Sequence, residues 1–488
     1  MKLGKLTEKL DILFSDADEN TEITGICYDS RSVCAGNVFV AVRGFESDGH
    51  RFIPNAVKAG ASVVVCEEKP EDTVPYILVE NSRLALALLS CAFYDYPAEK
   101  MTVIGVTGTS GKTTSTNLIK HILESQSGAK VGLIGTNGNM IGDEELHTEH
   151  TTPESLELQK LFAEMAEKGC THVVMEVSSH AIVLDRIAGI RYNVAAFTNL
   201  SQDHLDFHGT MEAYAEAKSR LFRRCDTACI NADDEISETM LSAAASGKCR
   251  VITTSAKTDG CSIKADHISL SSSDVQFDAV TEDSVSHVCL SIPGIFSVYN
   301  ALTAISVCTV CGISPDRCAA ALADADGVKG RMENVPTDGD YSVLIDYSHK
   351  PDALENVLKT LRPVTKGRLT VLFGCGGDRD RKKRPIMGKI AAENADVVIV
   401  TSDNPRTEDP DTIISEIMTG IKDPKAQIQV IPDRIEAIHW AIDNALPGDV
   451  VLLAGKGHED YQVIGHRKIH MDEREIVTDY LREKRASL

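Results

Sequence analysis

Short runs of β-branched and aliphatic residues alternate with segments of helical periodicity along most of the chain. In the middle of the chain, such runs occupy residues 102–106, 131–134, 172–177 and 194–197. Strands that are separated by helical segments are typical of right-handed βαβ units. The pattern therefore predicts a mainly parallel sheet in this part of the chain, with helices on its faces.

A second α/β set lies toward the carboxyl end of the chain. Residues 250–292, which precede it, alternate polar and apolar positions and are rich in turn residues, so they predict a β-rich insert. An apolar helix is expected at residues 297–311, and a strand at residues 38–42 near the amino end. The strands predicted in the second set are residues 342–345, 369–373, 397–400, 428–431 and 450–453.

These patterns predict an α/β fold in three domains, each large enough to bury its own core. The expected boundaries are 1–98, 99–330 and 331–488. Ligands of parallel sheets bind beyond the carboxyl ends of the strands, so polar clusters at those ends are expected to form the functional sites. Two domains of this kind suggest an active site in a cleft between them.

Composition narrows the classes of function. The formal net charge of −22 over 488 residues argues against nucleic acid or an anionic membrane as a partner. No apolar run approaches the ~18 residues of a membrane span, and residues 1–14 lack a signal-peptide core, so a cytoplasmic protein is expected. The 14 cysteines are spread singly and most are expected to be core residues, and no metal binding is expected at Cys308 and Cys311.

Residues 102–114, TVIGVTGTSGKTT, predict a strand, a glycine-rich turn and the start of a helix. Gly108 and Gly111 allow backbone N–H groups to curl around a polyanion, and the helix N-terminus adds the positive end of its dipole. Lys112 can reach terminal phosphates, while a following threonine can offer its hydroxyl to Mg²⁺. The first glycine of the usual GxxxxGK(S/T) motif would fall on Val106, so this is a shortened phosphate-binding loop.

Two further polar clusters follow predicted strands of the same domain. Residues 175–180, MEVSSH, place Glu176 at a strand end, where it is expected either to bind Mg²⁺ or to form a structural ion pair. Residues 198–209, TNLSQDHLDFHG, hold histidines and aspartates, but without cysteine ligands they fit magnesium and phosphate chemistry better than zinc. Lys218, on a predicted amphipathic helix, is by itself expected to be a solvated surface residue.

The carboxyl-terminal domain carries its own polar clusters. Residues 373–385, FGCGGDRDRKKRP, set glycine turns beside five cations, which predicts anion recognition. DNPR at residues 403–406 can bind a zwitterion, because its carboxylate suits an ammonium and its guanidinium can form a bidentate fork with a carboxylate. Arg331, at the hinge into this domain, can reach a phosphate.

The motifs that carry this chemistry occur in the order seen in Mur ligases, and the chain resembles that family over nearly its whole length. The resemblance implies an N-terminal UDP-sugar-binding domain, a central P-loop ATPase-type domain with a β-rich insert, and a C-terminal Rossmann-like domain that binds an amino acid. The motifs are GTSGKTT, TTPES, MEVSSHA, FTNLSQDHLDFHG, AKSRLF, GRME, DYSHKPDAL, FGCGGDRDRKKRP, DNPRTEDP and AGKGHEDYQ.

The resemblance also implies an activity in peptidoglycan precursor synthesis. ATP, with Mg²⁺, phosphorylates the D-glutamate carboxylate of UDP-N-acetylmuramoyl-L-alanyl-D-glutamate, and the amine of meso-2,6-diaminopimelate then attacks the acyl phosphate to form an amide. DNPR resembles the signature of the diaminopimelate-adding members, because Arg406 can pair with the carboxylate that lysine lacks. We expect the enzyme to be a monomer.

Site residues follow from the resemblance, position by position. For ATP, they are Gly108, Thr109, Ser110, Gly111, Lys112, Thr113, Thr114, Asn300, Arg331 and Asp346. The implied catalytic residues are Lys112, Glu176, His204 and Lys218, and the implied Mg²⁺ ligands are Thr113, Glu176, His204 and Lys218, the last as a carbamate. The implied UDP-sugar-peptide residues are Ser30, Phe45, Glu46, Ser47, Thr151, Thr152, Ser178 and Arg186. The implied diaminopimelate residues are Arg379, Asp403, Asn404, Pro405, Arg406, Gly455 and Glu459.

The sequence departs from the family pattern at His150, Leu184, Ser348 and Lys350, so contacts at these positions are not carried over. Two related activities stay open: the same ligase using L-lysine, and a folylpolyglutamate synthetase-like ligase with the same shortened loop. Two other classes fit less well. A P-loop GTPase would need an NKxD motif, which the sequence lacks, and a catalytically silent scaffold would not need the lysines and carboxylate of the phosphate-binding clusters.

Overall fold

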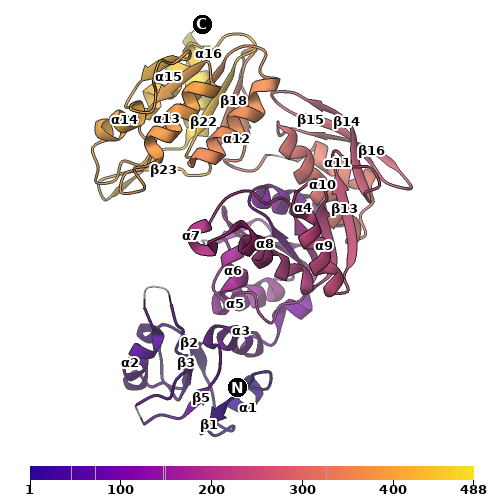
Figure 1. Cartoon of the computed structure of the whole chain (residues 1–488), viewed down its shortest axis with the longest axis vertical. Coiled ribbons are helices and arrows are strands. Elements are labelled where there is room, and N and C mark those ends of the chain that lie inside the picture. Colours follow the sequence, from indigo (N-terminus) through magenta and orange to yellow (C-terminus); the bar gives the residue numbers. More distant parts are fainter. Residues whose placement is uncertain (45–46, 72, 147, 149, 326, 488) are drawn as a thin grey trace. The chain divides into compact units, whose positions relative to one another are not determined.

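The computed structural model describes residues 1–44, 47–71, 73–146, 148, 150–325 and 327–487 (Figure 1). They form two compact units. The first consists of Met1–Ile263 and Thr303–Ser314, and the second of Lys264–Leu302 and Pro315–Leu488. The domain boundaries at residues 98 and 330 remain a prediction. Within the described ranges, no helix has the length and apolar character needed to cross a bilayer.

The first unit begins with a five-stranded sheet in the order β1-β5-β4-β3-β2. Strands β2 to β5 pair in parallel, and β1 pairs antiparallel to β5. The strand predicted at residues 38–42 is confirmed as β3, in which all four residues are buried. The elements are α1 Leu3–Leu6, β1 Phe14–Ser15, β2 Gly25–Cys27, η1 Ser30–Ser32, β3 Asn37–Val40, η2 Gly49–Phe52, α2 Ile53–Lys58, β4 Val63–Cys66, β5 Tyr76–Leu78, α3 Ser82–Phe93 and η3 Pro97–Lys100.

The main sheet of the first unit is parallel, in the order β13-β12-β11-β6-β10-β7. Its strands confirm the four runs predicted from the sequence, and a β8-β9 hairpin that was not predicted extends it antiparallel to β7. The strands are β6 Thr102–Thr107, β7 Val131–Gly135, β8 Gly138–Ile141, β9 Glu144–Leu146, β10 His172–Glu176, β11 Tyr192–Phe197, β12 Cys225–Asn231 and β13 Arg250–Ser255. The helices are α4 Lys112–Ser127, α5 Ser155–Glu167, α6 Ser179–Val183, α7 Leu205–His208, α8 Met211–Ser219, η4 Arg220–Arg223 and α9 Ser237–Ser246.

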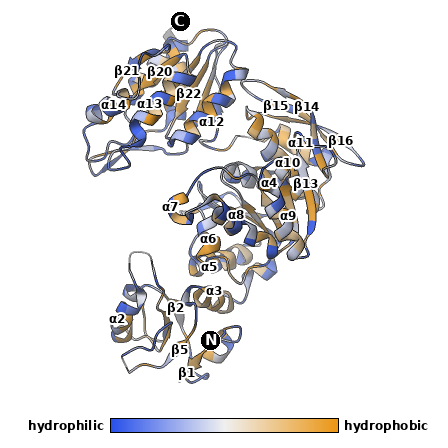
Figure 2. Cartoon of the chain, in the orientation of Figure 1, coloured by the Kyte–Doolittle hydropathy of each residue, from blue (hydrophilic) through white to orange (hydrophobic). Residues whose placement is uncertain are grey.

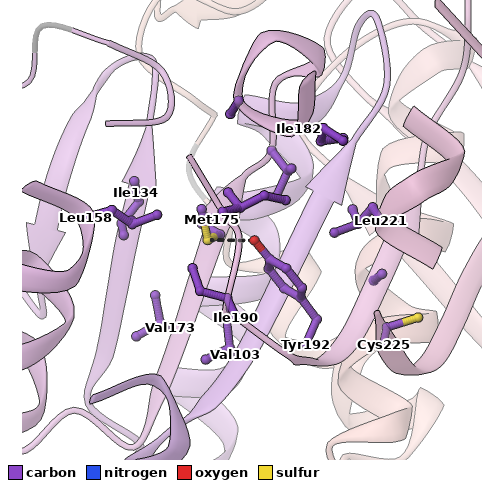
Figure 3. Close-up of a cluster of buried hydrophobic side chains, with 14 of the residues drawn as sticks. Val103, Ile134, Leu158, Val173, Met175, Ile182, Ile190, Tyr192, Leu221 and Cys225 are labelled. Carbon is purple, nitrogen blue, oxygen red and sulfur yellow. Dashed lines mark hydrogen bonds between the residues drawn. The ribbon is translucent and has the colours of Figure 1, made fainter. Parts of the chain in front are cut away.

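Tyr192 lies in the hydrophobic core of this sheet, surrounded by side chains from β6, β10 and the segments that cover them (Figure 3). Its ring is 0% exposed, and its hydroxyl donates to Met175 Sδ at 3.6 Å, so its polar atom has a partner despite its burial. Burial of such apolar surface is the main favourable term in folding. The core fixes β6, β10 and β11 against one another, with their carboxyl ends at one edge.

Residues 263–323 contain the insert predicted from the sequence. Strands β14 to β16 are antiparallel, as expected for a β-rich insert. The predicted insert is wrong in its first segment, because β13 pairs in parallel with β12 and continues the main sheet. The elements are β14 Ile263–Leu270, β15 Val275–Val280, β16 Val285–Leu290, α10 Ile295–Val310, which confirms the predicted helix, and α11 Pro315–Ala323.

The second unit ends in a six-stranded sheet in the order β17-β18-β22-β19-β20-β21. All neighbours pair in parallel except β17, and the five predicted strands are confirmed. Helices such as α12 and α13 carry both hydrophilic and hydrophobic positions, as expected for helices with one face on a sheet (Figure 2). The elements are β17 Glu333–Val335, β18 Ser342–Asp346, α12 Pro351–Leu361, η5 Arg362–Val364, β19 Leu369–Phe373, α13 Lys383–Asn394, β20 Val397–Val400, α14 Pro410–Met418, β21 Gln427–Val430, α15 Arg434–Asp443, β22 Val450–Ala454, β23 Tyr461–Ile464, β24 Arg467–His470 and α16 Glu473–Ser487.

Candidate active site

The glycine-rich loop lies between β6 and α4, as the sequence predicts. Gly108 and Gly111 have φ angles of 154° and 82°, so both use backbone conformations that favour glycine. A Cβ on Gly108 would lie 1.9 Å from Thr198 Oγ1, at the end of β11. Thr198 donates to the carbonyl of Ser110 at 2.7 Å, and the Ser110 N–H donates to Asn199 Oδ1 at 3.0 Å. The end of β11 therefore braces the loop.

Two lysines meet at the carbonyl of Gly108. Lys112 Nζ donates to this carbonyl and to that of Thr109, each at 2.9 Å. Lys218 Nζ donates to the Gly108 carbonyl at 2.8 Å and lies 4.6 Å from the centre of the Tyr214 ring. The expectation that Lys218 is a solvated surface residue is wrong, because α8 turns it inward until only 1% of it is exposed. Burial, together with the charge of Lys112, holds the pKa of Lys218 well below its ordinary value.

Glu176 is the centre of a hydrogen-bond cluster at the end of β10. Its carboxylate accepts from Thr113 Oγ1 and the N–H of Thr136, both at 2.9 Å, and from Thr136 Oγ1 at 3.1 Å. Thr136 Oγ1 also lies 3.0 Å from Thr151 Oγ1. Among the described residues no cation pairs with Glu176, so the alternative of a structural ion pair does not hold. A buried carboxylate beside a loop hydroxyl is an oxygen-donor set that suits Mg²⁺.

Gly135 provides a direct test of this arrangement, because a Cβ at this position would lie 2.6 Å from Glu176 Oε1. Gly135→Ala is expected to displace the carboxylate and to lower kcat by about 10- to 100-fold, as for the loss of one aligned polar group in an active site. Steady-state phosphate release measures kcat, and thermal melting checks that the alanine variant is folded. An alanine variant with full activity would show that the position of Glu176 is not important for catalysis.

His204 lies in a group of aromatic side chains beyond β11. Its backbone is left-handed, with φ of 53°, and its Nε2 lies 3.4 Å from Asp203 Oδ2. Its ring centroid is 4.9 Å from that of His180. His208 accompanies them, 2.9 Å from Ser179 Oγ, and burial lowers the pKa of His208 to about 4. Within the described ranges, no three or more histidines, cysteines, aspartates or glutamates are grouped so that they could hold a metal ion.

The residues implied for the UDP-sugar peptide form two groups. Thr152 Oγ1 donates to the Glu176 carbonyl at 2.8 Å and accepts from the N–H of Ser178 at 3.1 Å. Arg186 Nη1 donates to the Thr152 carbonyl at 3.1 Å, so this group adjoins the Glu176 cluster. Ser30 begins η1, and the carbonyl of Ser47 accepts from the Gly44 N–H at 2.9 Å. Phe45 and Glu46 lie outside the described residues.

The second unit contains a cavity of about 690 Å³ at the carboxyl ends of its strands. Six of the seven residues implied for diaminopimelate line it: Arg379, Asp403, Asn404, Arg406, Gly455 and Glu459. Pro405 lies behind the wall instead, where its carbonyl packs against Gly377. The cavity also includes residues that were not predicted from the sequence as site residues, among them Tyr347 and His349.

Arg406 is held through its backbone and its side chain. Its φ of 51° is left-handed, and its N–H donates to the Val463 carbonyl at 3.0 Å. Its Nη1 donates to the Gly377 carbonyl at 2.9 Å. A strained backbone of this kind persists where the surroundings over-determine it, which is common at functional sites. The guanidinium is thus fixed at a cavity that Asp403 and Glu459 also line.

The five cations of residues 379–384, for which anion recognition is predicted, divide into two groups. Arg379, Lys382 and Lys383 line the cavity. Arg384 is 0% exposed and donates to Glu408 at 2.8 and 2.9 Å and to Glu416 at 2.7 Å. Arg381 also pairs with Glu416. Arg384 and Arg381 are therefore structural, and they anchor the glycine-rich turn to α14.

Replacing Arg384 by methionine leaves Glu408 and Glu416 without their buried partner. We expect the variant to lose about 3–5 kcal/mol of stability at pH 7, the usual cost of breaking a buried ion pair. Hydrogen bonds from Arg384 lower the pKa of Glu408 to about 2, against about 4.3 when unfolded. That contribution is complete above pH 4.3 and is lost as the pH falls toward 2, so the difference between wild type and variant shrinks in acid. Urea unfolding at pH 7 and pH 3 measures it, and an equal difference at both would contradict the assignment.

Three residues implied for ATP lie in the second unit: Asn300, Arg331 and Asp346. Arg331 and Asp346 interact electrostatically. Asp346 Oδ2 accepts from the Met332 N–H at 2.9 Å, Asp346 also accepts from Ser348 Oγ, and burial raises the pKa of Asp346. The Arg331 guanidinium lies over the Tyr347 ring, 5.0 Å from its centre. Asn300 lies in α10 and is 4% exposed.

Three family models match the chain. The Mur ligase family, catalytic domain, matches residues 22–94, the Mur ligase middle domain matches residues 106–308, and the Mur ligase, glutamate ligase domain, matches residues 330–457. Together they cover most of the sequence in the same order as the three predicted domains.

Two proteins that are similar to this chain over nearly its full length are named UDP-N-acetylmuramoyl-L-alanyl-D-glutamate--2,6-diaminopimelate ligase and UDP-N-acetylmuramoyl-L-alanyl-D-glutamate--2,6-diaminopimelate ligase 1. The protein of Caldanaerobacter subterraneus subsp. tengcongensis is 48% identical over 469 residues, which cover 95% of this chain and 96% of that protein. The protein of Clostridium acetobutylicum is 45% identical over 487 residues, which cover 99% of this chain and 100% of that protein.

Solved structures give the same result. A ligase of that name superposes with a TM-score of 0.77 at 32% identity and covers 99% of both chains. Folylpolyglutamate synthase from Mycobacterium tuberculosis superposes with a TM-score of 0.62, at 16% identity and over 77% of this chain. At so low an identity, the second likeness shows a shared fold alone.

Proposed function

Because the chain belongs to the Mur ligase family, with its three-domain α/β fold, we propose that it is an ATP-dependent ligase that adds 2,6-diaminopimelate to the D-glutamate of UDP-N-acetylmuramoyl-L-alanyl-D-glutamate. One observation carries the proposal: a chain matched over its full length by diaminopimelate-adding ligases gathers Asp403, Glu459, Arg379 and Arg406 in one cavity. Such a set can hold both charges of an amino-carboxyl centre. The activity belongs to peptidoglycan synthesis, and we propose a cytoplasmic monomer that uses the meso isomer.

The first half of the reaction activates a carboxylate, which is a poor electrophile on its own. ATP transfers its γ-phosphoryl group to the D-glutamate carboxylate, giving ADP and an acyl phosphate. The glycine-rich loop and the N-terminus of α4 present N–H donors to the phosphates, and Lys112 offsets charge on the transferred group. Thr152 contacts the Glu176 and Ser178 backbones, and Arg186 donates to the Thr152 carbonyl, which supports the proposal that these residues hold the carboxylate close to the phosphates.

The donor set in the first unit fits Mg²⁺. Thr113 Oγ1 and the Glu176 carboxylate lie 2.9 Å apart, and both residues are buried. Bound Mg²⁺ supplies positive charge that offsets the phosphate oxygens. Glu176 is oriented for this role by Thr136. Lys218 is held with a lowered pKa, and an uncharged amine is the form that can add CO₂ to give a carbamate. We propose that this carbamate and His204 complete the metal ligands.

The second half of the reaction forms the amide. An amine of diaminopimelate attacks the acyl phosphate, the carbon–nitrogen bond forms and inorganic phosphate leaves. The end of diaminopimelate that does not react carries the second amino-carboxyl centre. We propose that the cavity of the second unit binds this centre, in which Arg406 pairs with the carboxylate and Asp403 and Glu459 pair with the ammonium. L-lysine lacks that carboxylate and would leave the guanidinium unpaired, so no feature of the cavity favours it.

A phosphate-release assay tests the proposal. The protein is expected to release phosphate from ATP only when UDP-N-acetylmuramoyl-L-alanyl-D-glutamate, 2,6-diaminopimelate and Mg²⁺ are all present, and each omission should reduce the rate to background. Release that depends on a folate and glutamate would identify a folylpolyglutamate synthetase-like ligase instead. Release without any acceptor would indicate a simple ATPase.

A further inference from the structure

A fully buried lysine lies behind the wall of the proposed amino-acid site. Lys456 is 0% exposed, and its Nζ lies 3.4 Å from Asp403 Oδ1, 3.1 Å from Asn404 Oδ1 and 3.2 Å from Glu459 Oε2. All three partners line the cavity, whereas Lys456 does not. The lysine therefore contacts the site from inside the protein, where it has no direct access to a ligand.

We propose that Lys456 is a positioning residue that sets the specificity of this cavity for the ammonium of the second amino-carboxyl centre of diaminopimelate. It does so by holding Asn404 and Glu459 in one hydrogen-bonded arrangement. This inference rests on the proposed function.

The contacts of Lys456 determine how the Asn404 amide is oriented. Asn404 Oδ1 lies 3.1 Å from Lys456 Nζ and accepts from the Val463 N–H at 2.9 Å. Both partners are donors, so the amide carbonyl must face them. The amide nitrogen then points to Glu459, and Nδ2 donates to Glu459 Oε2 at 2.8 Å. Without Lys456, the amide carbonyl of Asn404 would keep one donor among the described residues, the Val463 N–H, and the contact from Nδ2 to Glu459 would lose the lysine that holds the Glu459 carboxylate in place.

Lys456 also decides which oxygen of Glu459 remains for a ligand. Lys456 and Asn404 both donate to Oε2, and within the described residues no hydrogen bond reaches Oε1. A carboxylate with one oxygen occupied by protein donors can direct the other to a cationic group of the substrate.

Charge balance leads to the same conclusion. Asp403 and Glu459 contribute two negative charges, and the buried ammonium of Lys456 offsets one of them. The remaining single negative charge matches a single ammonium on the ligand. Without Lys456, Asp403 and Glu459 would lose the buried ammonium that contacts both of their carboxylates, and the repulsion between two neighbouring carboxylates would no longer be offset from inside the protein.

The test replaces Lys456 by methionine, which keeps much of the length and removes the donor. We expect kcat/KM for diaminopimelate to fall by about 100-fold, the range seen when a buried charged hydrogen-bond partner is removed. KM for ATP and for the UDP-linked substrate should stay within about twofold, because both bind elsewhere in the proposed mechanism. Lys389→Met is the matched control, since Lys389 lies on α13 outside this cavity and pairs only weakly with Glu393, at 3.8 Å.

A double-mutant cycle separates positioning from a general structural role. If Lys456 acts through Glu459, then Lys456→Met adds little further loss in a Glu459→Gln background, whereas independent effects would multiply. If the methionine variant does not fold, Lys456→Gln keeps an N–H donor and should show a smaller fall in kcat/KM for diaminopimelate, of about 10-fold.

The outcomes are distinct. Unchanged kinetics for diaminopimelate, an equal loss for all three substrates, or multiplicative losses in the cycle would each overturn the role of Lys456. Wild-type enzyme assayed in parallel reports on the proposed function: if it shows no diaminopimelate-dependent phosphate release, that function fails and the inference fails with it. Wild-type activity with unaffected Lys456 variants would overturn the inference alone.

Discussion

Replacing Arg406 by alanine is expected to lower kcat/KM for diaminopimelate by about 10³-fold or more, while KM for ATP stays within about threefold. The guanidinium is fixed at the cavity by the Gly377 carbonyl and by its own left-handed backbone, so it is already in place for a carboxylate. Removing it leaves that carboxylate to be desolvated without a partner, and pockets built for a polar group discriminate by 10⁴–10⁵ in favourable cases, so about 10³ is a moderate expectation.

Two comparisons make the Arg406 result interpretable. Arg406→Lys keeps the charge but loses the planar fork, and we expect it to recover only part of the lost rate. The preference for diaminopimelate over L-lysine should fall sharply in the alanine variant, because L-lysine has no second carboxylate to pair with the Arg406 guanidinium and so loses nothing when it is removed. A variant in which ATP and diaminopimelate kinetics decline equally would show that Arg406 supports the fold of the loop and not the choice of amino acid.

Replacing Lys112 by alanine is expected to lower kcat by about 10³-fold with all substrates saturating, comparable to the larger effects of single electrostatic groups in transition states. The reason is its position: it opens α4, and its ammonium lies against the carbonyls of the phosphate-binding loop. Lys130→Ala is the control, since the Lys130 ammonium donates to the Lys168 carbonyl at the exposed surface, away from the glycine-rich loop. Rates come from phosphate release, and nucleotide binding from calorimetry. A Lys112→Ala variant with wild-type kcat would show that Lys112 does not contribute to phosphoryl transfer.

Much of the framework could be read from the sequence because it depends on local signals. The run before Gly108 had to be a buried strand, and the glycines after it required an unusual backbone, so the loop between β6 and α4 was predictable. The same reasoning placed DNPR after β20. Since the carboxyl ends of parallel strands share an edge, their polar clusters were expected to meet, and in the second unit they line one cavity.

What the sequence reading missed depends on packing between distant segments. Lys218 has the local pattern of a surface lysine, and only the approach of α8 to the glycine-rich loop shows that it is buried. The cations at 381 and 384 look like their neighbours in sequence, but their partners Glu408 and Glu416 lie on a later segment. Lys456 stands in a recognised motif, yet its role appears only when its three contacts are seen together. Long-range pairing of this kind has no local periodicity to reveal it.

The central claim, that this Mur ligase selects diaminopimelate, is tested most directly by competition. The enzyme is given ATP, Mg²⁺, UDP-N-acetylmuramoyl-L-alanyl-D-glutamate and equal concentrations of meso-2,6-diaminopimelate and L-lysine, and the UDP-linked products are weighed by mass spectrometry. We predict that the diaminopimelate-containing tripeptide product exceeds the lysine product by at least about 10³-fold. Comparable amounts of the two products, or an excess of the lysine product, would contradict the account.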